Sequence, residues 1–385
     1  MDTLMKSVTT KKIHGIGAAL FVAAMALPSY QPAMAEAAPE KGVVAFKYLN
    51  YQDSQPDQDR IAVNAYSTSV MMPFAGNWSV STSYTYDSLS GASPRRHDYF
   101  DTIAGASQMS EKRHAGDLNF TRYLDKGSLT FGTSYSEESD YISRGYSLQR
   151  SFLTIDNNTT VTLGGSYNTD TINAWKKEVY GRAKKVYAGL FGVTKVLTKK
   201  DIVQVNIGFS RGDGYFSDPY KEGEGGTLDP RPKERNITTL LTRWNHHFDS
   251  SDGTARVSYR YYTDSYDISA HTLGVEYVQP LPYRLTITPA VRYSSQTAAY
   301  FYVPKASYNH LADPYKPYSY DERLSAFGAL TLGVKVEKQI AADWTVDVKY
   351  EQYEQRADWC MTGNGDASLQ PFRFRSIQLG VARQL

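Results

Sequence analysis

The sequence predicts an all-β fold: a transmembrane antiparallel β-barrel of about 16 strands, with short periplasmic turns and long extracellular loops. Three observations predict it. Apolar and polar residues alternate with period two in many segments, and the breaks between these segments alternate between short and long. Tyrosine is also unusually frequent, with 31 Tyr against 15 Phe and 5 Trp.

The alternation is clear in residues 343–355, DWTVDVKYEQYEQ. Trp344, Val346, Val348 and Tyr350 fall on one side of an extended chain, and charged residues fall on the other. Period two indicates a strand with one apolar and one polar face. The segments DIVQVNIGFS, TARVSYRYY, YRLTITPAVRY and WSVSTSYTY alternate in the same way.

The breaks between these strands are of two kinds that take turns along the chain. Short clusters of Asp, Asn, Gly and Pro, suited to hairpin turns, lie at 73–77, 124–127, 156–158, 197–201, 249–253, 279–282 and 341–343. Longer, polar or Pro-rich breaks lie near 91–109, 168–183, 211–234, 303–322 and 357–371, with shorter examples around 52–59, 137–143 and 263–269. An even strand number with short turns at one end and long loops at the other is typical of bacterial outer-membrane barrels.

A soluble antiparallel sandwich is the alternative, because it also alternates apolar and polar residues. The aromatic residues argue against it, since they gather near both ends of the strands, as the two lipid–water boundaries favour. On the turn side these are Phe74, Trp78, Tyr123, Phe248, Tyr283 and Trp344; on the loop side they are Tyr84, Tyr86, Tyr135, Tyr167, Tyr261, Tyr293 and Tyr350.

The N-terminus has the features of a signal peptide. Lys6, Lys11 and Lys12 precede an apolar run, IHGIGAALFVAAMAL, and then Ala33-Met34-Ala35. The run is shorter than the ~20 residues of a spanning helix, so an uncleaved anchor is the less favoured reading. We expect residues 1–35 to be the signal peptide, residues 36–385 to form one barrel domain, and the cell outer membrane to be its location.

The charge and the cysteine content exclude two classes of protein. Loss of residues 1–35 would remove three of the 42 basic and one of the 40 acidic residues, which leaves a mature chain with no net charge. Nucleic acid is therefore not an expected partner, because phosphate binding needs a concentrated positive surface. Cys360 is the only cysteine, so a disulfide-stapled domain is excluded.

Four segments carry a family resemblance: YDSLSGASP, EESDY, GFSRGDGYFSDPYK and TGNGDASLQPFRFRSIQLGVARQL. Over about residues 42–385 the chain resembles a domain-of-unknown-function family of Gram-negative outer-membrane β-barrel proteins with a signal peptide. The resemblance implies a barrel and an envelope context. It also implies a periplasmic redox or flavin-linked partner, because members look to be often encoded beside flavin-transfer and thioredoxin-like proteins.

The charged faces of the strands are the main candidate site. If the apolar faces meet lipid, the charged faces enclose a lumen, because a charge on the lipid face near mid-membrane costs about 2–4 kcal/mol. Two outcomes stay open: a water-filled channel whose charges tune the passage of solutes, or charges that pair and close the interior. The lumen-facing candidates are Arg256, Arg260, Glu276, Arg292, Lys335, Glu337, Asp347, Lys349 and Glu351.

The loop SRGDGYFSDPYKEGEGGTLDP offers carboxylates among glycines. Asp213, Asp218, Glu222 and Glu224 are weak candidates for a divalent cation, which takes oxygen ligands. Their spacing matches no defined calcium loop, so a solvated surface loop is the favoured reading. A bridge to lipopolysaccharide through divalent ions is an intermediate interpretation.

Isolated histidines and the cysteine offer little chemistry. His271 lies on an apolar strand face, but the position two residues later, where an outer-membrane phospholipase carries its serine, is Leu273. His246 and His247 point to opposite faces and cannot chelate one ion. Cys360 is expected to be an exposed loop thiol.

The sequence therefore predicts an outer-membrane pore or conduit for small polar solutes, with no enzymatic activity and no cofactor. The alternative is a closed scaffold barrel that anchors or matures a periplasmic or surface partner. Expected partners are outer-membrane lipid, lipopolysaccharide and the barrel assembly machinery.

Overall fold

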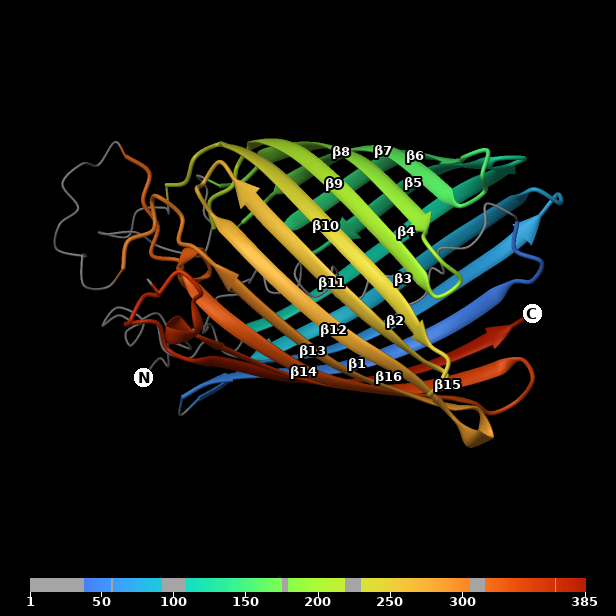
Figure 1. Ribbon diagram of the computed structural model, residues 1–385. Coiled ribbons are helices and arrows are strands. Elements are labelled where there is room, and N and C mark those ends of the chain that lie inside the picture. The colour runs from blue at the N-terminus through green and yellow to red at the C-terminus, as the bar shows by residue number, and fades with distance from the viewer. Residues whose placement is uncertain are drawn as a thin grey trace, which may run out of the picture.

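The computed structural model describes residues 38–56, 58–91, 109–174, 179–218, 230–304, 316–363 and 365–385. These residues form 16 antiparallel strands that close into one barrel (Figure 1). The strands are β1 (Val43–Gln55), β2 (Gln58–Phe74), β3 (Trp78–Gly91), β4 (Met109–Leu124), β5 (Gly127–Glu137), β6 (Tyr141–Leu153), β7 (Thr159–Ile172), β8 (Arg182–Val196), β9 (Asp201–Gly214), β10 (Glu234–Phe248), β11 (Gly253–Asp264), β12 (Ser269–Leu281), β13 (Leu285–Gln296), β14 (Phe327–Gln339), β15 (Trp344–Arg356) and β16 (Phe372–Gln384).

Every strand pairs with its neighbours in sequence, and β1 pairs with β16 to close the barrel. The closing register runs from Val43 opposite Gln384 to Ser54 opposite Arg373. Closure leaves no open sheet edge, which is the condition for a sheet to cross a lipid bilayer. The predicted all-β transmembrane barrel of about 16 strands is confirmed.

Strand length fits a membrane span. The strands contain between 11 residues, in β5, and 17 residues, in β2. At about 3.3 Å per residue, a 13-residue strand is about 43 Å long, and a tilt near 45° reduces its height to the ~30 Å of a hydrocarbon core. Among the described residues, no helix is long and apolar enough to cross a membrane. The helical turns are η3 (Pro282–Arg284), η5 (Glu322–Leu324) and η6 (Ala357–Trp359).

Tight turns join the strands at one end of the barrel, and the longer predicted breaks join them at the other end (Figure 1). Two of these breaks are shorter than predicted, because only residues 56–57 separate β1 from β2 and only residues 138–140 separate β5 from β6. The β2–β3 turn places Ala75 (φ 49°) and Gly76 (φ 73°) in the left-handed region that hairpin turns use. The break expected at 279–282 lies slightly later, because β12 continues through Pro280 to Leu281 and the chain turns at Tyr283 (φ 64°).

The described loops carry an apolar cluster of five buried residues at the long-loop end. Tyr266, Ile268, Ala299, Phe301 and Leu324 are buried together there. The cluster packs against Tyr262 at the end of β11. The loop-side end of the barrel is therefore partly ordered by its own core.

Candidate functional site: the barrel lumen

The two faces of the barrel wall have opposite character. Large apolar side chains project outward and stay exposed, for example Phe131 (49%), Leu148 (54%), Phe209 (57%) and Leu332 (54%). Alternate residues on the same strands form the inner face. This division is what a lipid-exposed exterior and a polar interior require.

The aromatic girdles lie on the outer face, with one correction. Tyr123 was predicted to join the turn-side girdle, but its hydroxyl is hydrogen-bonded to Ser79 (3.1 Å), which faces the interior. The ring therefore faces inward. Alternation assigns Tyr123 to this face, and its place near the turn is what suggested a girdle.

All nine charged residues named from the sequence lie on the inner face, on β11 to β15. Some form ion pairs along or across the wall. Lys335 Nζ lies 2.6 Å from Glu337 Oε2, and Lys349 Nζ lies 3.1 Å from Glu351 Oε1. Arg256 Nη1 lies 4.0 Å from Glu276 Oε2 across β11 and β12.

Lys47 and Arg243 also belong to this inner face and were missed. Lys47 on β1 lies opposite Gly380 and within electrostatic reach of Asp347, Lys335 and Lys349. Arg243 on β10 lies opposite Ser258. The alternation in LLTRWNHHF carried the signal for Arg243, which shares its strand face with Asn245 and His247. In VVAFKYLNYQ it did not, because the neighbours of Lys47 on the same face are Ala45 and Leu49.

The opposite half of the lumen is lined mainly by uncharged residues. The middle inner positions of β2 to β9 carry mainly Ser, Thr, Asn and Gly, with Asp117 as the charged exception. Hydroxyls bond across strands, as Thr85 does to Ser67 (3.1 Å) and Thr121 to Thr130 (2.9 Å). We call this half the hydroxyl wall (inner faces of β2–β9) and the other the charged wall (inner faces of β10–β16 and β1).

Glycines keep the hydroxyl wall flat. Asn119 lies opposite Gly132, Asn168 opposite Gly145 and Asn206 opposite Gly192. At each glycine, an added Cβ would meet the neighbouring amide oxygen well inside van der Waals contact, at 2.6 Å for Gly192. The asparagine amides therefore lie along the wall, in space that a side chain would fill.

At the long-loop end, part of the β13–β14 connection folds over the inner face. Gln296 Nε2 donates to the carbonyls of Arg323 (3.0 Å) and Ser325 (2.8 Å). Asp321, fully buried on its side chain, accepts from Arg231 (2.7 Å) and also pairs with Arg323. This ion cluster fixes the loop above β11–β13.

The loop carboxylates proposed for a metal are separated. Asp213 lies on the exposed outer phase of β9, whereas Asp218 is buried and pairs with Arg323. Glu222 and Glu224 lie outside the described residues. Within the described part of the chain, no group of three or more His, Cys, Asp or Glu could hold a metal ion.

The histidines lie mainly on the outer face. His271 Nδ1 is hydrogen-bonded to the Tyr259 hydroxyl (2.7 Å). His246 contacts Asp201 (2.7 Å), whereas His247 contacts Thr254 on the inner face (3.4 Å), so the two diverge.

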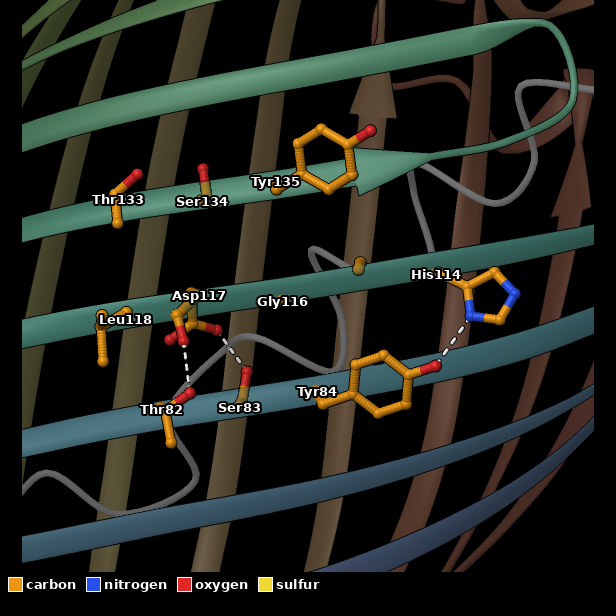
Figure 2. A pocket seen from close by; sticks show the side chains of 11 residues that line it. Thr82, Ser83, Tyr84, His114, Gly116, Asp117, Leu118, Thr133, Ser134 and Tyr135 are labelled. Carbon is orange, nitrogen blue, oxygen red and sulfur yellow. Dashed lines mark hydrogen bonds between the residues drawn. The ribbon is translucent and has the colours of Figure 1, made fainter.

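A shallow groove repeats the His–Tyr arrangement on the outer face of β3–β5 (Figure 2). The Tyr84 hydroxyl is hydrogen-bonded to His114 Nδ1 (2.7 Å), and Gly116 leaves the space between Tyr84 and Tyr135. Asp117, behind the groove, accepts a hydrogen bond from Ser83. The His–Tyr pairs belong to the loop-side girdle, where rings with polar tips are expected.

Cys360 was predicted to be exposed, and this is wrong. The thiol is buried and donates to the Gln296 carbonyl (3.4 Å), because η6 folds back over the outer face of β13 and β14. Gly328 permits this, since a Cβ there would collide with the Trp359 carbonyl. The predicted signal peptide, residues 1–35, lies outside the described residues.

Comparison with one solved structure supports the fold. The chain resembles the bacterial polysaccharide outer membrane secretin (8% identity, TM-score 0.51), covering 89% of this chain and 98% of that one. It also matches the siderophore receptor PirA from Pseudomonas aeruginosa (10% identity, TM-score 0.45, 88% of this chain), of which it spans 62%. A third match is OccD3 (OpdP) from Pseudomonas aeruginosa (9% identity, TM-score 0.45), with 92% and 95% covered.

No curated protein matches the chain. The family model described as "Protein of unknown function (DUF3570)" matches residues 17–99 and 98–376. The match extends over nearly the whole barrel, and it confirms the resemblance drawn from the sequence. The chain therefore belongs to the DUF3570 family, with an outer-membrane-type β-barrel as its fold.

Proposed function

We propose that this protein is an outer-membrane pore, a passive conduit for small polar solutes. The observation that carries the proposal is the exposure of charged side chains inside a closed barrel. Arg243, Arg260, Glu276 and Arg292 all face the interior, and all are exposed. The Glu276 side chain keeps 50% of its surface accessible, beside an Arg256 that keeps 35%.

Exposed interior charges require water. An ionised group that loses its hydration without full pairing costs several kcal/mol, so these side chains support a hydrated lumen. Barrels of about 16 strands are wide enough for an aqueous channel. A hydrated wall of hydroxyls, amides and charges suits polar solutes better than apolar ones.

The same proposal includes the route to the membrane. Residues 1–35 would direct export, and the barrel assembly machinery would insert the mature chain. The outer face would then contact outer-membrane lipid, with lipopolysaccharide against the loop-side girdle. The exposed apolar band and the two girdles support this placement.

The proposal includes no catalysis and no cofactor. His271, the residue considered for lipid hydrolysis, has its Nδ1 occupied by the Tyr259 hydroxyl. Among the described residues, no hydrogen bond links His271 to a serine, which a Ser–His nucleophile needs.

One observation favours the second candidate, a closed scaffold barrel. The loop around Asp321 folds over the inner face and is fixed by buried ion pairs with Arg231 and Arg323. A mouth covered in this way would suit a barrel that anchors a periplasmic or surface partner.

Planar bilayer recordings distinguish the two candidates. We expect the purified, refolded protein to give discrete conductance steps at 0.1–1 M KCl. The matched control is the same preparation kept unfolded in denaturant before dilution, which should give none. Silence from protein shown to be folded by heat-modifiable gel migration would reject the pore, and a partner recovered with the native protein would then support the scaffold.

A further inference from the structure

The charged wall concentrates positive charge in one place. By register, Arg243 on β10, Ser258 on β11, Gly274 on β12 and Arg292 on β13 lie side by side. Arg256 and Arg260 flank Ser258 along β11, two residues away in either direction. We call these six residues the arginine patch.

The dimensions of the arginine patch suit a small ligand. Arg243 and Arg292 are three strand intervals apart, about 14 Å at 4.7–4.9 Å per interval. Arg256 and Arg260 are also about 14 Å apart along the strand at about 3.4 Å per residue. Between the four arginines lie only the small residues Ser258 and Gly274, so no large side chain fills this space. Even a Cβ at Gly274 would lie 2.8 Å from Ser258 Oγ.

Three of the four guanidinium groups lack a carboxylate partner among the described residues. Glu276 is the carboxylate at this level, and it pairs loosely with Arg256 (4.0 Å). Arg260 lies over the Tyr262 ring, and Arg292 donates a long hydrogen bond to Thr331 (3.5 Å). Among the described residues, no carboxylate lies within ion-pair distance of Arg243, Arg260 or Arg292.

The neighbouring cations are neutralised more completely. Lys335 pairs with Glu337, Lys349 pairs with Glu351, and Lys47 lies near Asp347. Across the lumen, the hydroxyl wall supplies few carboxylates in its middle region. The positive potential of the lumen is therefore centred on the arginine patch.

We propose that the arginine patch is a binding and selectivity site for small oxyanions, that is, carboxylates or phosphates in transit. Guanidinium groups bind both through paired N–H donors, which a lysine ammonium cannot reproduce. A site that concentrates anions in the lumen raises their local concentration and their rate of entry. This inference rests on the proposed pore function, and it adds a preference for anions to it.

The zero-current potential across a bilayer in a KCl gradient tests the proposal. At about 0.1 M salt, where screening extends over about 10 Å, chloride should be favoured over potassium by about threefold or more. The triple variant Arg243→Gln/Arg260→Gln/Arg292→Gln should bring the ratio to unity or reverse it. The matched control, Arg122→Gln/Arg144→Gln/Arg211→Gln, removes three outer-face charges and should leave the ratio unchanged.

Further variants keep the test decisive. Ser258→Glu adds a carboxylate within the patch and should lower anion preference without removing an arginine. It therefore tests the arginine patch even if the triple Arg→Gln variant fails to fold. In the wild type, inorganic phosphate or succinate should bind the patch and block the chloride current. The triple Arg→Lys variant should retain chloride preference and lose this block. If phosphate blocks and succinate does not, the patch prefers phosphates; the reverse indicates carboxylates.

The outcomes separate the two proposals. Absence of conductance would reject the pore itself. Conductance without anion preference in the wild type, or with a preference that the patch variants leave unchanged, would overturn the arginine patch and keep the pore.

Discussion

Asn119 lies flat against the backbone of Gly132 on the neighbouring strand, with its amide oxygen in the space that a Cβ would need. The pair faces the lumen from the hydroxyl wall. The Asn119 amide also donates to Asp117 Oδ2 (3.1 Å), so it is held along the wall. The width of the lumen at this level therefore depends on the absence of a side chain at position 132.

Gly132→Leu should narrow the pore. The new side chain would displace the Asn119 amide and the Ser147 hydroxyl toward the lumen axis, and we expect single-channel conductance to fall measurably. The double variant Asn119→Ala/Gly132→Ala should keep most of the wild-type conductance, because it has only a methyl group at position 132 and no amide to displace. The control Gly189→Ala, on the outer face where a Cβ meets no atom within 4 Å, should not change conductance. Unchanged conductance in Gly132→Leu would show that this wall does not limit passage.

The assignment of the two faces predicts an asymmetry in stability. Val348 is 48% exposed on the outer face near mid-strand. Val348→Arg should destabilise the barrel in phospholipid by about 2–4 kcal/mol, because it places a charge against acyl chains. Ser166→Arg, on the inner hydroxyl wall, should cost much less. Denaturant titration of refolding into vesicles measures both, and equal costs would contradict the face assignment.

Sequence alone predicted what depends on local periodicity. Period-two alternation identifies the face of Asp347, Lys349 and Glu351 from the strand itself, and turn chemistry indicates the hairpins. It could not predict how the long connections fold, because those contacts join residues far apart in sequence. Cys360 was misjudged for this reason, since its burial depends on Gly328, 32 positions earlier in the numbering. The arginine patch was readable in principle, because Arg243 occupies the polar phase of β10, but its meaning requires the register between strands.

The loop between β5 and β6 should make stability depend on pH. Burial raises the pKa of Glu138 to about 7; the Arg113 guanidinium opposes this shift, and the neighbouring Asp140 and Asp87 add to it. Between the ordinary value of 4.5 and about 7, the folded state holds a proton that the unfolded state has lost. Stability from this group is thus complete below pH 4.5 and is lost as the pH rises through 7.

Glu138→Gln should remove that dependence and stabilise the protein at pH 8 by about 1–3 kcal/mol. Thermal unfolding in detergent from pH 4.5 to 8.5 measures it. Glu137→Gln, an exposed neighbour, is the control and should follow the wild-type profile. Parallel profiles for wild type and Glu138→Gln would mean that Glu138 is ionised throughout the range.

The strap formed by η6 and residues 360–363 predicts the reactivity of the single thiol. Cys360 is 7% exposed, and its sulfur lies 3.0 Å from Thr362 Oγ1. Ser295 holds the strap from β13 by accepting from the Met361 amide (2.9 Å). In the folded barrel, the thiol should therefore react with a maleimide only when the strap opens, at least about 100-fold more slowly than in denaturant.

Gly328→Ala forces a methyl group against the Trp359 carbonyl and should raise the folded-state rate about tenfold or more, by favouring the open strap. Gly189→Ala, also on the outer face, should leave the rate at its wild-type value. A fast wild-type reaction, or a rate that Gly328→Ala does not change, would show that the strap does not cover Cys360 in solution.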